Sequence, residues 1–499
     1  MRTIVALWLS IGVWLAGDGT IGLAQEQERT STSKKRVALA EQEEVASALR
    51  ILEAWIESQL AYKQLPGLSI GIVHDQELIW AKGYGYADVE KKIPATPRTV
   101  YRIASISKLF TSIAILQLRD QGKLHLDDPV AKHLPWFQIK IPHADAPAIT
   151  IRHLLTHTSG LPRESDFPYW NDNQFPTRQQ LIDKLPSQEA PYPPETKWKY
   201  SNLALSLAGE IVSAVSGKPY EEYVQQHILA PLDMTSSAVG VPQSLRSRLA
   251  VGYGRRLPDN TRAIRPFTDL RGINPAGALS SNVEDLAQFA ALQFRDGPAG
   301  GAQILKGSTL REMQRVHWLM PDWKSGRGLG FHIIHRDAGD LVGHGGWVAG
   351  YQSAFYCRPT DKIAVIALFN ADDGLPYPGM PDSVVDRAFQ WVGPALRKAT
   401  TPIEDIQPRP EWQKYVGKFR TPWGDTQVLL HNGKLVLINP TDQDPLGGRA
   451  TLTPVREHVF RIEDGPLSGP HGELVVFEMG KDGKVTRVKI GSSYTYPLE

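Results

Sequence analysis

Residues 101–109 read Tyr-Arg-Ile-Ala-Ser-Ile-Ser-Lys-Leu, and this stretch decides how the rest of the chain is interpreted. It opens a segment whose apolar residues recur at helical spacing and in which Gly122 stands where a C-terminal glycine cap belongs. We therefore predict a helix that begins at Ser105. Residues i and i+3 share a helix face, so the amine of Lys108 can approach the hydroxyl of Ser105. The helix N-terminus also supplies backbone N–H groups and a positive field, which suit a developing oxyanion.

Ser-x-x-Lys alone is weak, and two other stretches compete with it. Ser31 and Lys34 repeat the spacing in a polar segment, where nothing would hold the pair in a fixed geometry. Without further matches, Ser105 would simply cap a helix and Lys108 would be solvated. Residues 67–71 form a Gly-x-Ser-x-Gly motif around Ser69, which requires a sharp strand-to-helix turn to expose its serine. Ser69 lies inside a predicted strand, 68–74, and a second strand follows at 78–86 in place of a helix. We therefore predict that Ser69 is not a nucleophile.

Two further motifs follow in order along the chain. Tyr200-Ser201-Asn202 begins an apolar helical segment, and His344-Gly345-Gly346 ends a predicted strand. Together with Ser105 and Lys108 they resemble the active-site elements of the serine β-lactamase and penicillin-binding-protein superfamily. The match is strongest to its class C branch, with D-Ala-D-Ala carboxypeptidases, D-aminopeptidases and β-lactamase-like carboxylesterases. The flanking stretches 153–161, 276–281 and 328–331 are also similar to that family, and the resemblance covers roughly residues 40–395.

The resemblance implies a role for each motif residue. Ser105 would be the nucleophile, and Lys108 its base if burial or nearby positive charge holds the amine neutral. Tyr200 would share that proton and later protonate the leaving group or activate water. Asn202 would orient Lys108 and the acyl side chain.

The third motif would hold the substrate. The backbone N–H groups of Ser105 and Trp347 would form the oxyanion hole, and Gly345 and Gly346 would let the substrate approach the strand edge. His344 stands where many relatives have a lysine. Because histidine is largely neutral at pH 7, we expect uncharged esters or amide-terminated peptides to react better than β-lactam carboxylates.

Composition limits the class of protein. The 499 residues include 41% hydrophobic and 22% charged residues with a net charge of +2, which predicts a globular protein and gives no support to a nucleic-acid partner. Arg2, the apolar run 4–16 and the small residues at 22–24 are typical of a secretory signal peptide over residues 1–24. That run is too short to span a bilayer, so we expect an exported protein, periplasmic or secreted, without stable membrane insertion.

The order of predicted elements indicates the fold class, α/β. After a disordered segment, 25–37, strands at both ends of residues 38–396 and helices between them predict one antiparallel sheet flanked by helices, with a helical subdomain. Helices are expected over 38–62 and over 382–392. Another is expected to end at Phe294, with a capping box at Ser281–Glu284 ahead of it. Pro402, Pro408 and Pro410 mark a linker over 397–411. Six short strands are expected beyond it, at 415–419, 427–430, 435–438, 458–461, 474–479 and 485–490, with turns at Asn432-Gly433 and Asp482-Gly483. They predict a small antiparallel β-barrel, 412–499, that looks like a lipocalin-like domain; it would either cover the catalytic domain or shape its entrance.

Three residues outside the motifs could suggest metal or thiol chemistry. His153 and His157 lie at i, i+4, but no third ligand is evident and the family resemblance makes the segment structural. Cys357, the single cysteine, lies on an apolar strand and is most simply a small core residue. We therefore expect no metal and no cofactor.

The sequence thus predicts a serine hydrolase that acts through an acyl-enzyme on Ser105 and cleaves ester, amide or peptide bonds of small molecules. Two alternatives remain open. One is a β-lactamase that hydrolyses β-lactam antibiotics. The other is a catalytically silent protein of penicillin-binding type that recognises cell-wall peptides.

Overall fold

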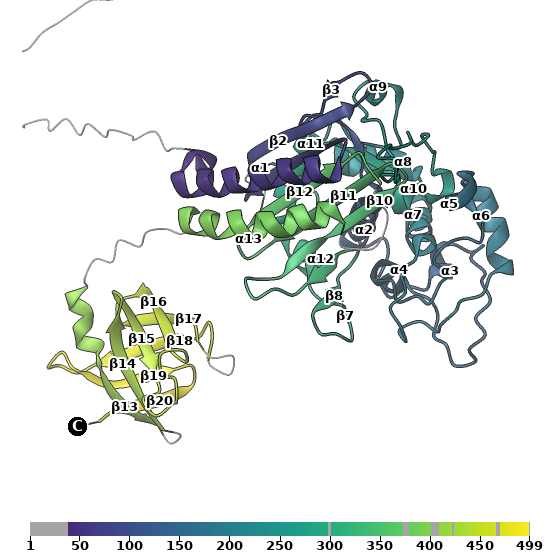
Figure 1. Ribbon diagram of the computed structural model, residues 1–499. Coiled ribbons are helices and arrows are strands. Elements are labelled where there is room, and N and C mark those ends of the chain that lie inside the picture. Colours follow the sequence, from purple (N-terminus) through teal and green to yellow (C-terminus); the bar gives the residue numbers. More distant parts are fainter. Residues whose placement is uncertain are drawn as a thin grey trace, which may run out of the picture. The chain divides into compact units, whose positions relative to one another are not determined.

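Strands from both ends of the first unit pair in one antiparallel sheet, as the sequence predicts (Figure 1). β1 (Gly67–His74) pairs with β2 (Glu77–Asp88) on one side and with β12 (Ile363–Phe369) on the other. The sheet order is β3-β2-β1-β12-β11-β10-β9-β8-β7. The other strands are β3 (Ile93–Pro94), β7 (Trp318–Leu319), β8 (Ser325–Arg327), β9 (His332–Ile334), β10 (Leu341–Val348) and β11 (Tyr351–Arg358).

The computed structural model describes residues 38–297, 301–372, 379–400, 409–421, 424–465 and 470–498. The chain divides into two units after Thr400. The predicted signal peptide 1–24, the segment 25–37 with its Ser31 motif, and residues 401–408 of the predicted linker lie outside the described residues.

Helices cover both faces of the sheet, which explains why its central strands are apolar throughout. α1 (Glu43–Lys63) and α13 (Met380–Thr400) pack together on one face, where Trp55 and Trp391 meet edge to face at 5.8 Å (Figure 1). α11 (Val283–Gln293) and α2 (Ser107–Asp120) cover the other face. Every residue of β12 is buried, because neither face meets water.

α2 is the central helix of the unit and carries the Ser-x-x-Lys motif at its start. Twelve of its residues are buried, and Phe110 stacks on Phe289 of α11 at 4.2 Å. The helix ends as predicted: Gly122 has φ +72°, and the backbone N–H of Lys123 donates to the carbonyl of Leu118, which is a Schellman cap.

The helical subdomain lies between β4 and β7 in the chain. It contains α3 (Val130–His133), α4 (Ile151–Thr156), α5 (Tyr169–Asp172), α6 (Arg178–Lys184), α7 (Asn202–Ser216), α8 (Tyr220–Val224), α9 (Gln243–Arg246), α10 (Asn274–Gly277) and α12 (Gly307–Gln314). The unit also has single 3₁₀ turns, η1 (Leu39–Glu41) ahead of α1, η2 (Ala104–Ile106), η3 (Leu185–Ser187) and η5 (Arg271–Ile273), and a five-residue π-helix, η4 (Gln225–Leu229). A small second sheet has the order β4-β6-β5, from β4 (Tyr101–Arg102), β5 (Ala238–Val239) and β6 (Leu279–Ser281).

The second unit is a closed antiparallel barrel of eight strands with its own apolar core. After η6 (Pro410–Tyr415), the strands are β13 (Gly417–Thr421), β14 (Gly424–His431), β15 (Lys434–Ile438), β16 (Ala450–Arg456), β17 (Val459–Asp464), β18 (Leu474–Met479), β19 (Val485–Ile490) and β20 (Ser493–Pro497). The turn predicted at Asn432-Gly433 is present, with φ of +48° and +71°. The α/β fold class with a following barrel is therefore confirmed.

Several predicted boundaries are wrong. The last helix runs past Val392 to Thr400 and through Pro394, because its buried face continues to Leu396; the linker cannot begin at 397. The cap of α11 is Asn282, not Ser281, and its side chain accepts from the N–H of Asp285 at 2.8 Å. In the barrel, β16 and β20 were not predicted, and the strand expected from Tyr415 starts at Gly417.

Candidate active site

Ser105 lies in a single 3₁₀ turn, η2, between β4 and α2. The α-helix begins at Ser107 and not, as predicted, at Ser105, because the chain must first turn sharply out of the strand. Ala104 takes a left-handed conformation with φ +49°, which is uncommon for a residue with a side chain. The hydroxyl of Ser107 donates to the carbonyl of Ala104 at 2.6 Å and so closes the turn. The turn leaves the Ser105 hydroxyl facing a cavity.

Lys108 is completely buried, with no exposed surface. Its Nζ donates to Ser105 Oγ at 3.0 Å, to Asn202 Oδ1 at 2.9 Å and to the carbonyl of Ala276 at 2.6 Å. Burial lowers the pKa of this amine to about 7, while the carboxylate of Glu164 acts in the opposite direction and the guanidinium of Arg163 adds to the lowering. At neutral pH a large fraction of the amine can therefore accept a proton, as a base must.

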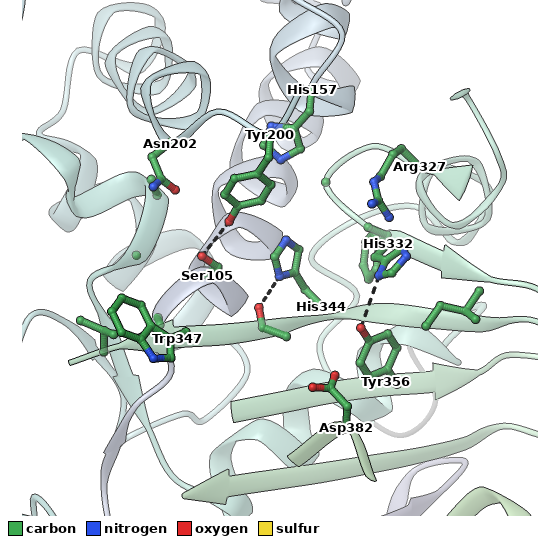
Figure 2. Close-up of a pocket in the computed structure, with 18 of the residues that line it drawn as sticks. Ser105, His157, Tyr200, Asn202, Arg327, His332, His344, Trp347, Tyr356 and Asp382 are labelled. Carbon is green, nitrogen blue, oxygen red and sulfur yellow. Dashed lines mark hydrogen bonds between the residues drawn. The ribbon is translucent and has the colours of Figure 1, made fainter. Parts of the chain in front are cut away.

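Tyr200 holds the same serine from the other side. Its hydroxyl donates to Ser105 Oγ at 2.7 Å (Figure 2). The ring packs against that of His157 at 4.6 Å, and Lys108 Nζ lies 4.9 Å from the ring centroid. The backbone helps: Ser201 caps α7, and its N–H donates to Nδ1 of His157 at 3.1 Å.

Asn202, the first residue of α7, links Lys108 to a carboxylate. Its Oδ1 accepts from Lys108, and its Nδ2 donates to Glu164 Oε1 at 2.7 Å. Glu164 lies three residues after the family-like stretch 153–161 and was not predicted as a site residue.

The His344–Trp347 stretch lies on β10 beside the serine turn. Among the described strands, β9 pairs only with residues 341–343 of β10, so residues 344–348 pair with β11 alone. Gly346 makes an internal contact that the sequence did not predict: a Cβ there would lie 2.3 Å from the carbonyl of Ile103 and from Ser353 Oγ. This glycine lets β10 pack against Ile103, the residue before the serine turn. That Gly345 and Gly346 let the substrate approach the strand edge stays a prediction.

His344 and Trp347 both line the cavity. Burial and the nearby Lys108 lower the pKa of His344 to about 3, so the ring is neutral at pH 7. Trp347 is held by a hydrogen bond from its Nε1 to Asp372 Oδ1 at 2.6 Å and by contact with Trp170 at 5.8 Å. The indole is thus a fixed wall beside Ser105.

The cavity has a volume of about 810 Å³ and extends well beyond the motif residues (Figure 2). Trp170, Trp198 and Phe331 give it apolar walls. Its polar groups outside the three motifs are His157, Arg163, Arg327, His332, Arg336, Tyr356, Asp382 and Asp386; of these, the sequence pointed only to His157, as a possible metal ligand. The other seven lie on loops, on strands and in the first two turns of α13, where no spacing rule identifies them. Only Arg163, Arg327 and His332 lie within two residues of stretches, 153–161 and 328–331, that resemble the family.

Arg327 introduces a cation into this cavity. The guanidinium stacks on Trp198 at 4.2 Å and donates to the carbonyl of Gly326, and no carboxylate lies within ion-pair distance in the described residues. Burial lowers its pKa to about 10, which still leaves it charged at neutral pH.

The other candidates of the sequence analysis have structural surroundings. Ser69 is fully buried in β1, where its hydroxyl donates to the carbonyl of Thr96 at 2.7 Å and bonds to Tyr101 Oη at 2.9 Å. His153 completes the capping box of α4, and His157 is the left-handed cap at its other end. Cys357 is buried, and burial raises the pKa of its thiol. Within the described ranges, no group of three or more His, Cys, Asp or Glu side chains is placed to hold a metal ion, and no helix is long and apolar enough to cross a membrane.

Comparison with known proteins assigns the chain to a family. The family model described as Beta-lactamase matches residues 52–388. Protein flp of Staphylococcus aureus (strain MW2) is 32% identical over 244 residues, which cover 49% of this chain and 48% of that protein. The chain thus spans about half the length of the curated relatives it matches.

Two solved structures share the fold. The octameric penicillin-binding protein homologue from Pyrococcus abyssi is 26% identical with a TM-score of 0.60, and the match covers 90% of this chain and 99% of that one. The D-amino acid amidase from Ochrobactrum anthropi SV3 is 26% identical with a TM-score of 0.59, over 71% of this chain and 100% of that one. Because the family model covers more than half of the sequence, the chain belongs to the beta-lactamase family, whose structural relatives here include hydrolases.

Proposed function

We propose that this protein is an exported serine hydrolase that forms an acyl-enzyme on Ser105 and cleaves ester or amide bonds of small substrates. One observation carries the proposal: Ser105 Oγ accepts hydrogen bonds from both Lys108 Nζ and Tyr200 Oη, at 3.0 and 2.7 Å, at the wall of an 810 Å³ cavity. Nucleophilic catalysis needs an accessible hydroxyl that is hydrogen-bonded to groups able to accept and return its proton, and the amine and the phenol can serve as these groups.

Acylation follows from these contacts. The neutral amine of Lys108 takes the hydroxyl proton while Oγ attacks the substrate carbonyl carbon, and the new C–O bond turns the carbonyl oxygen into an oxyanion. The backbone N–H groups of Ser105 and Trp347 would stabilise that charge. Tyr200, whose hydroxyl contacts Ser105 Oγ, passes a proton to the leaving alcohol or amine as the old bond breaks.

Deacylation reverses the proton path. A water molecule attacks the ester on Ser105, gives its proton to the Lys108–Tyr200 pair, and the serine oxygen regains a proton as it leaves. The same groups thus act as base in one half-reaction and as acid in the other.

The substrate preference rests on His344. A neutral imidazole can donate or accept a hydrogen bond but does not attract a carboxylate as a lysine would. The lowered pKa of this residue strengthens the expectation that uncharged esters and amides react best.

A second candidate function, hydrolysis of β-lactams, is favoured by Arg327. This guanidinium faces the same cavity without a carboxylate partner in the described residues and could attract the carboxylate of a β-lactam in place of a lysine at 344. The two functions differ in whether a cation of the site binds a carboxylate of the substrate.

The test is covalent labelling followed by a substrate panel. Intact-mass measurement after treatment with an active-site serine phosphonate should show one added phosphonyl group, absent in Ser105→Ala. p-Nitrophenyl esters, D-amino-acid amides and cephalosporins are then compared by kcat/KM. No label on the wild type would instead support the silent binding protein, and a preference for cephalosporins would support the β-lactamase. Export is tested separately, by finding the mature protein outside the cytoplasm with its first residue near position 25.

A further inference from the structure

The side-chain amide of Asn202 bridges Lys108 and a carboxylate that the family motifs do not include. Asn202 Oδ1 accepts from Lys108 Nζ at 2.9 Å, and Asn202 Nδ2 donates to Glu164 Oε1 at 2.7 Å. All three side chains are buried or half-buried. The base of the proposed reaction therefore rests on a chain of contacts that ends at Glu164.

Glu164 is itself held firmly. Its loop is fastened to the start of α7, since the N–H of Asn202 donates to the carbonyl of Arg163 at 2.8 Å and Ser201 Oγ donates to the carbonyl of Pro162 at 2.6 Å. The phenol of Tyr169 donates to Glu164 Oε2, and Arg163 Nε lies 3.2 Å from Oε1. Burial, together with the adjacent Glu164 charge, raises the pKa of Tyr169, so it remains a phenol that donates.

These contacts determine which way the amide points. An asparagine side chain can present either its oxygen or its NH₂ to a given neighbour. An ionised carboxylate only accepts hydrogen bonds, so the NH₂ group must face Glu164 and the oxygen must face Lys108. The oxygen at that place is what holds the Lys108 amine against Ser105.

We propose that Glu164 is a positioning residue for the hydrolase reaction: it orients Asn202 so that the amide oxygen holds Lys108 at Ser105, and its negative charge adjusts how readily Lys108 carries a proton. The inference rests on the proposed function, because it concerns the base of that reaction. Glu164 is not among the cavity-lining residues and acts through Asn202.

The charge effect can be separated from the other groups around Lys108. Glu164 favours the protonated amine, whereas Arg163 opposes it. The ionisable groups that face Lys108 from the surrounding elements are Glu164 and Arg163 on the loop, Tyr200 before α7, His157 at the end of α4 and His344 on β10. Arg327 on β8 acts on the two histidines. Both histidines have lowered pKa values and are neutral near pH 7, so Glu164 is the anion of this set.

The first test compares Glu164→Gln with Glu164→Asp, using kcat/KM for a short-chain p-nitrophenyl ester from pH 5 to 9. Glutamine has the same size but can present either end to Asn202, so the plateau should fall by roughly tenfold to a hundredfold. Loss of the negative charge should also move the acid-limb midpoint down by roughly 0.5–1 pH unit. Glu164→Asp keeps an acceptor-only carboxylate and should leave the midpoint near that of the wild type. Glu195→Gln, an exposed carboxylate at His153, is the matched control and should change neither value.

The second test reverses the polarity of the pair. In Asn202→Asp two carboxylates face each other, and activity should fall strongly. Adding Glu164→Gln places an amide NH₂ group at position 164, which can donate to the carboxylate at position 202, while that carboxylate still accepts from Lys108. The double variant should therefore recover at least tenfold in plateau kcat/KM over Asn202→Asp. Failure of the double variant to recover, or a Glu164→Gln plateau and midpoint equal to the wild type, would overturn the proposal.

Two controls keep the outcomes distinct. Thermal melts establish which variants fold, and if Glu164→Gln alone does not, the polarity-reversed pair decides. Equal losses in Glu164→Gln and Glu164→Asp without a midpoint shift would mean that Glu164 only packs, which also overturns the proposal. Activity that survives Ser105→Ala in the same assay would instead sink the proposed function itself.

Discussion

Two serines in this protein, Ser69 in β1 and Ser105 in the turn before α2, show what makes a hydroxyl a candidate nucleophile. Ser69 has the more familiar motif, Gly-x-Ser-x-Gly, but its hydroxyl is sealed inside the unit and bonds to a carbonyl and to a phenol. Burial raises the pKa of that phenol, Tyr101, so it is not ready to lose its proton. Ser105 bonds to an amine with a pKa near neutrality and faces a cavity. Accessibility and a proton acceptor, not the local motif, separate the two.

The neighbouring glycines support the same contrast. Gly71, the last residue of the Gly-x-Ser-x-Gly motif, allows α11 to approach β1: a Cβ there would lie 2.4 Å from Val283 Cγ1. The motif in β1 thus reflects helix-to-sheet packing.

The largest expected effect distinguishes the serines directly. Ser105→Ala should lose phosphonate labelling and lower kcat by roughly 10⁴-fold or more, because no other hydroxyl has the two proton carriers. Ser69→Ala should label fully and keep its kcat, but its free energy of unfolding should fall by about 1–3 kcal/mol as buried partners lose their hydrogen bond. Phosphonate labelling and denaturant melts of both variants check this. If Ser105→Ala were still labelled, Ser105 would not be the nucleophile.

The next effect tests the amine. Lys108→Arg replaces the base with a group that stays protonated, so kcat/KM for esters should fall by roughly 10²–10⁴-fold. Lys199→Arg, next to Tyr200 in sequence but outside the hydrogen bonds of Ser105, is the matched control and should stay active. Ester kinetics measure both, and an active Lys108→Arg would mean that Tyr200 alone takes the proton.

The pH dependence of the wild type should report the same amine. Since Lys108 must be neutral to act and its pKa is about 7, kcat/KM should rise with pH through a midpoint near 7 and fall about tenfold per unit on the acid side. A pH–rate profile on a neutral ester, whose own charge does not change, gives the midpoint. An acid limb near pH 4 would point to a carboxylate base instead.

A smaller effect is expected at His344. His344→Lys should shift the ratio of kcat/KM for a cephalosporin over that for a neutral ester by about tenfold toward the cephalosporin, which corresponds to ~1.4 kcal/mol. Arg327→Gln should move the ratio the other way if Arg327 contributes to anion binding. Both ratios are measured at pH 7.5; an unchanged ratio in His344→Lys would show that residue 344 does not read the substrate's charge.

The smallest effect should come from removing the barrel. A chain that ends at Thr400 retains both serines and both core clusters of the first unit, while the barrel has a core of its own. It should fold and label at Ser105 as the full chain does. Circular dichroism and intact mass check this, and an insoluble product would show that the two units depend on each other for stability.

The sequence predicted the parts that follow from periodicity and motif, and missed those that depend on tertiary contact. The sheet, α2 with its Gly122 cap and the cluster of Ser105, Lys108, Tyr200 and Asn202 could all be inferred. The predicted last helix ended too early, at Val392, because the apolar face that keeps α13 helical through Pro394 is visible only once the helix packs on the sheet. β20 alternates serine, threonine and tyrosine with little apolar signal, so barrel closure was needed to reveal it.

The missed site residues have a common cause. Glu164, Arg327 and Asp382 are charged residues on a loop, a short strand and a helix start, and in sequence they are indistinguishable from solvated surface charges. Only the fold brings Arg327 and Asp382 to the cavity and Glu164 to Asn202. Burial then raises the pKa of Asp382 to about 6 and lowers that of Arg327 to about 10.

The burial of the Lys108 amine also affects the thermodynamics of folding. The unfolded lysine titrates near 10.5, whereas the folded one has a pKa of about 7. Between these values the unfolded chain binds more protons than the folded chain, so the free energy of unfolding should rise with pH across that window. Below pH 7 the amine is protonated in both states, and its contribution to the free energy of unfolding no longer changes with pH. Folding at pH 8 to 9 therefore releases a proton from this site, and the calorimetric heat of folding should depend on the ionisation enthalpy of the buffer that receives it.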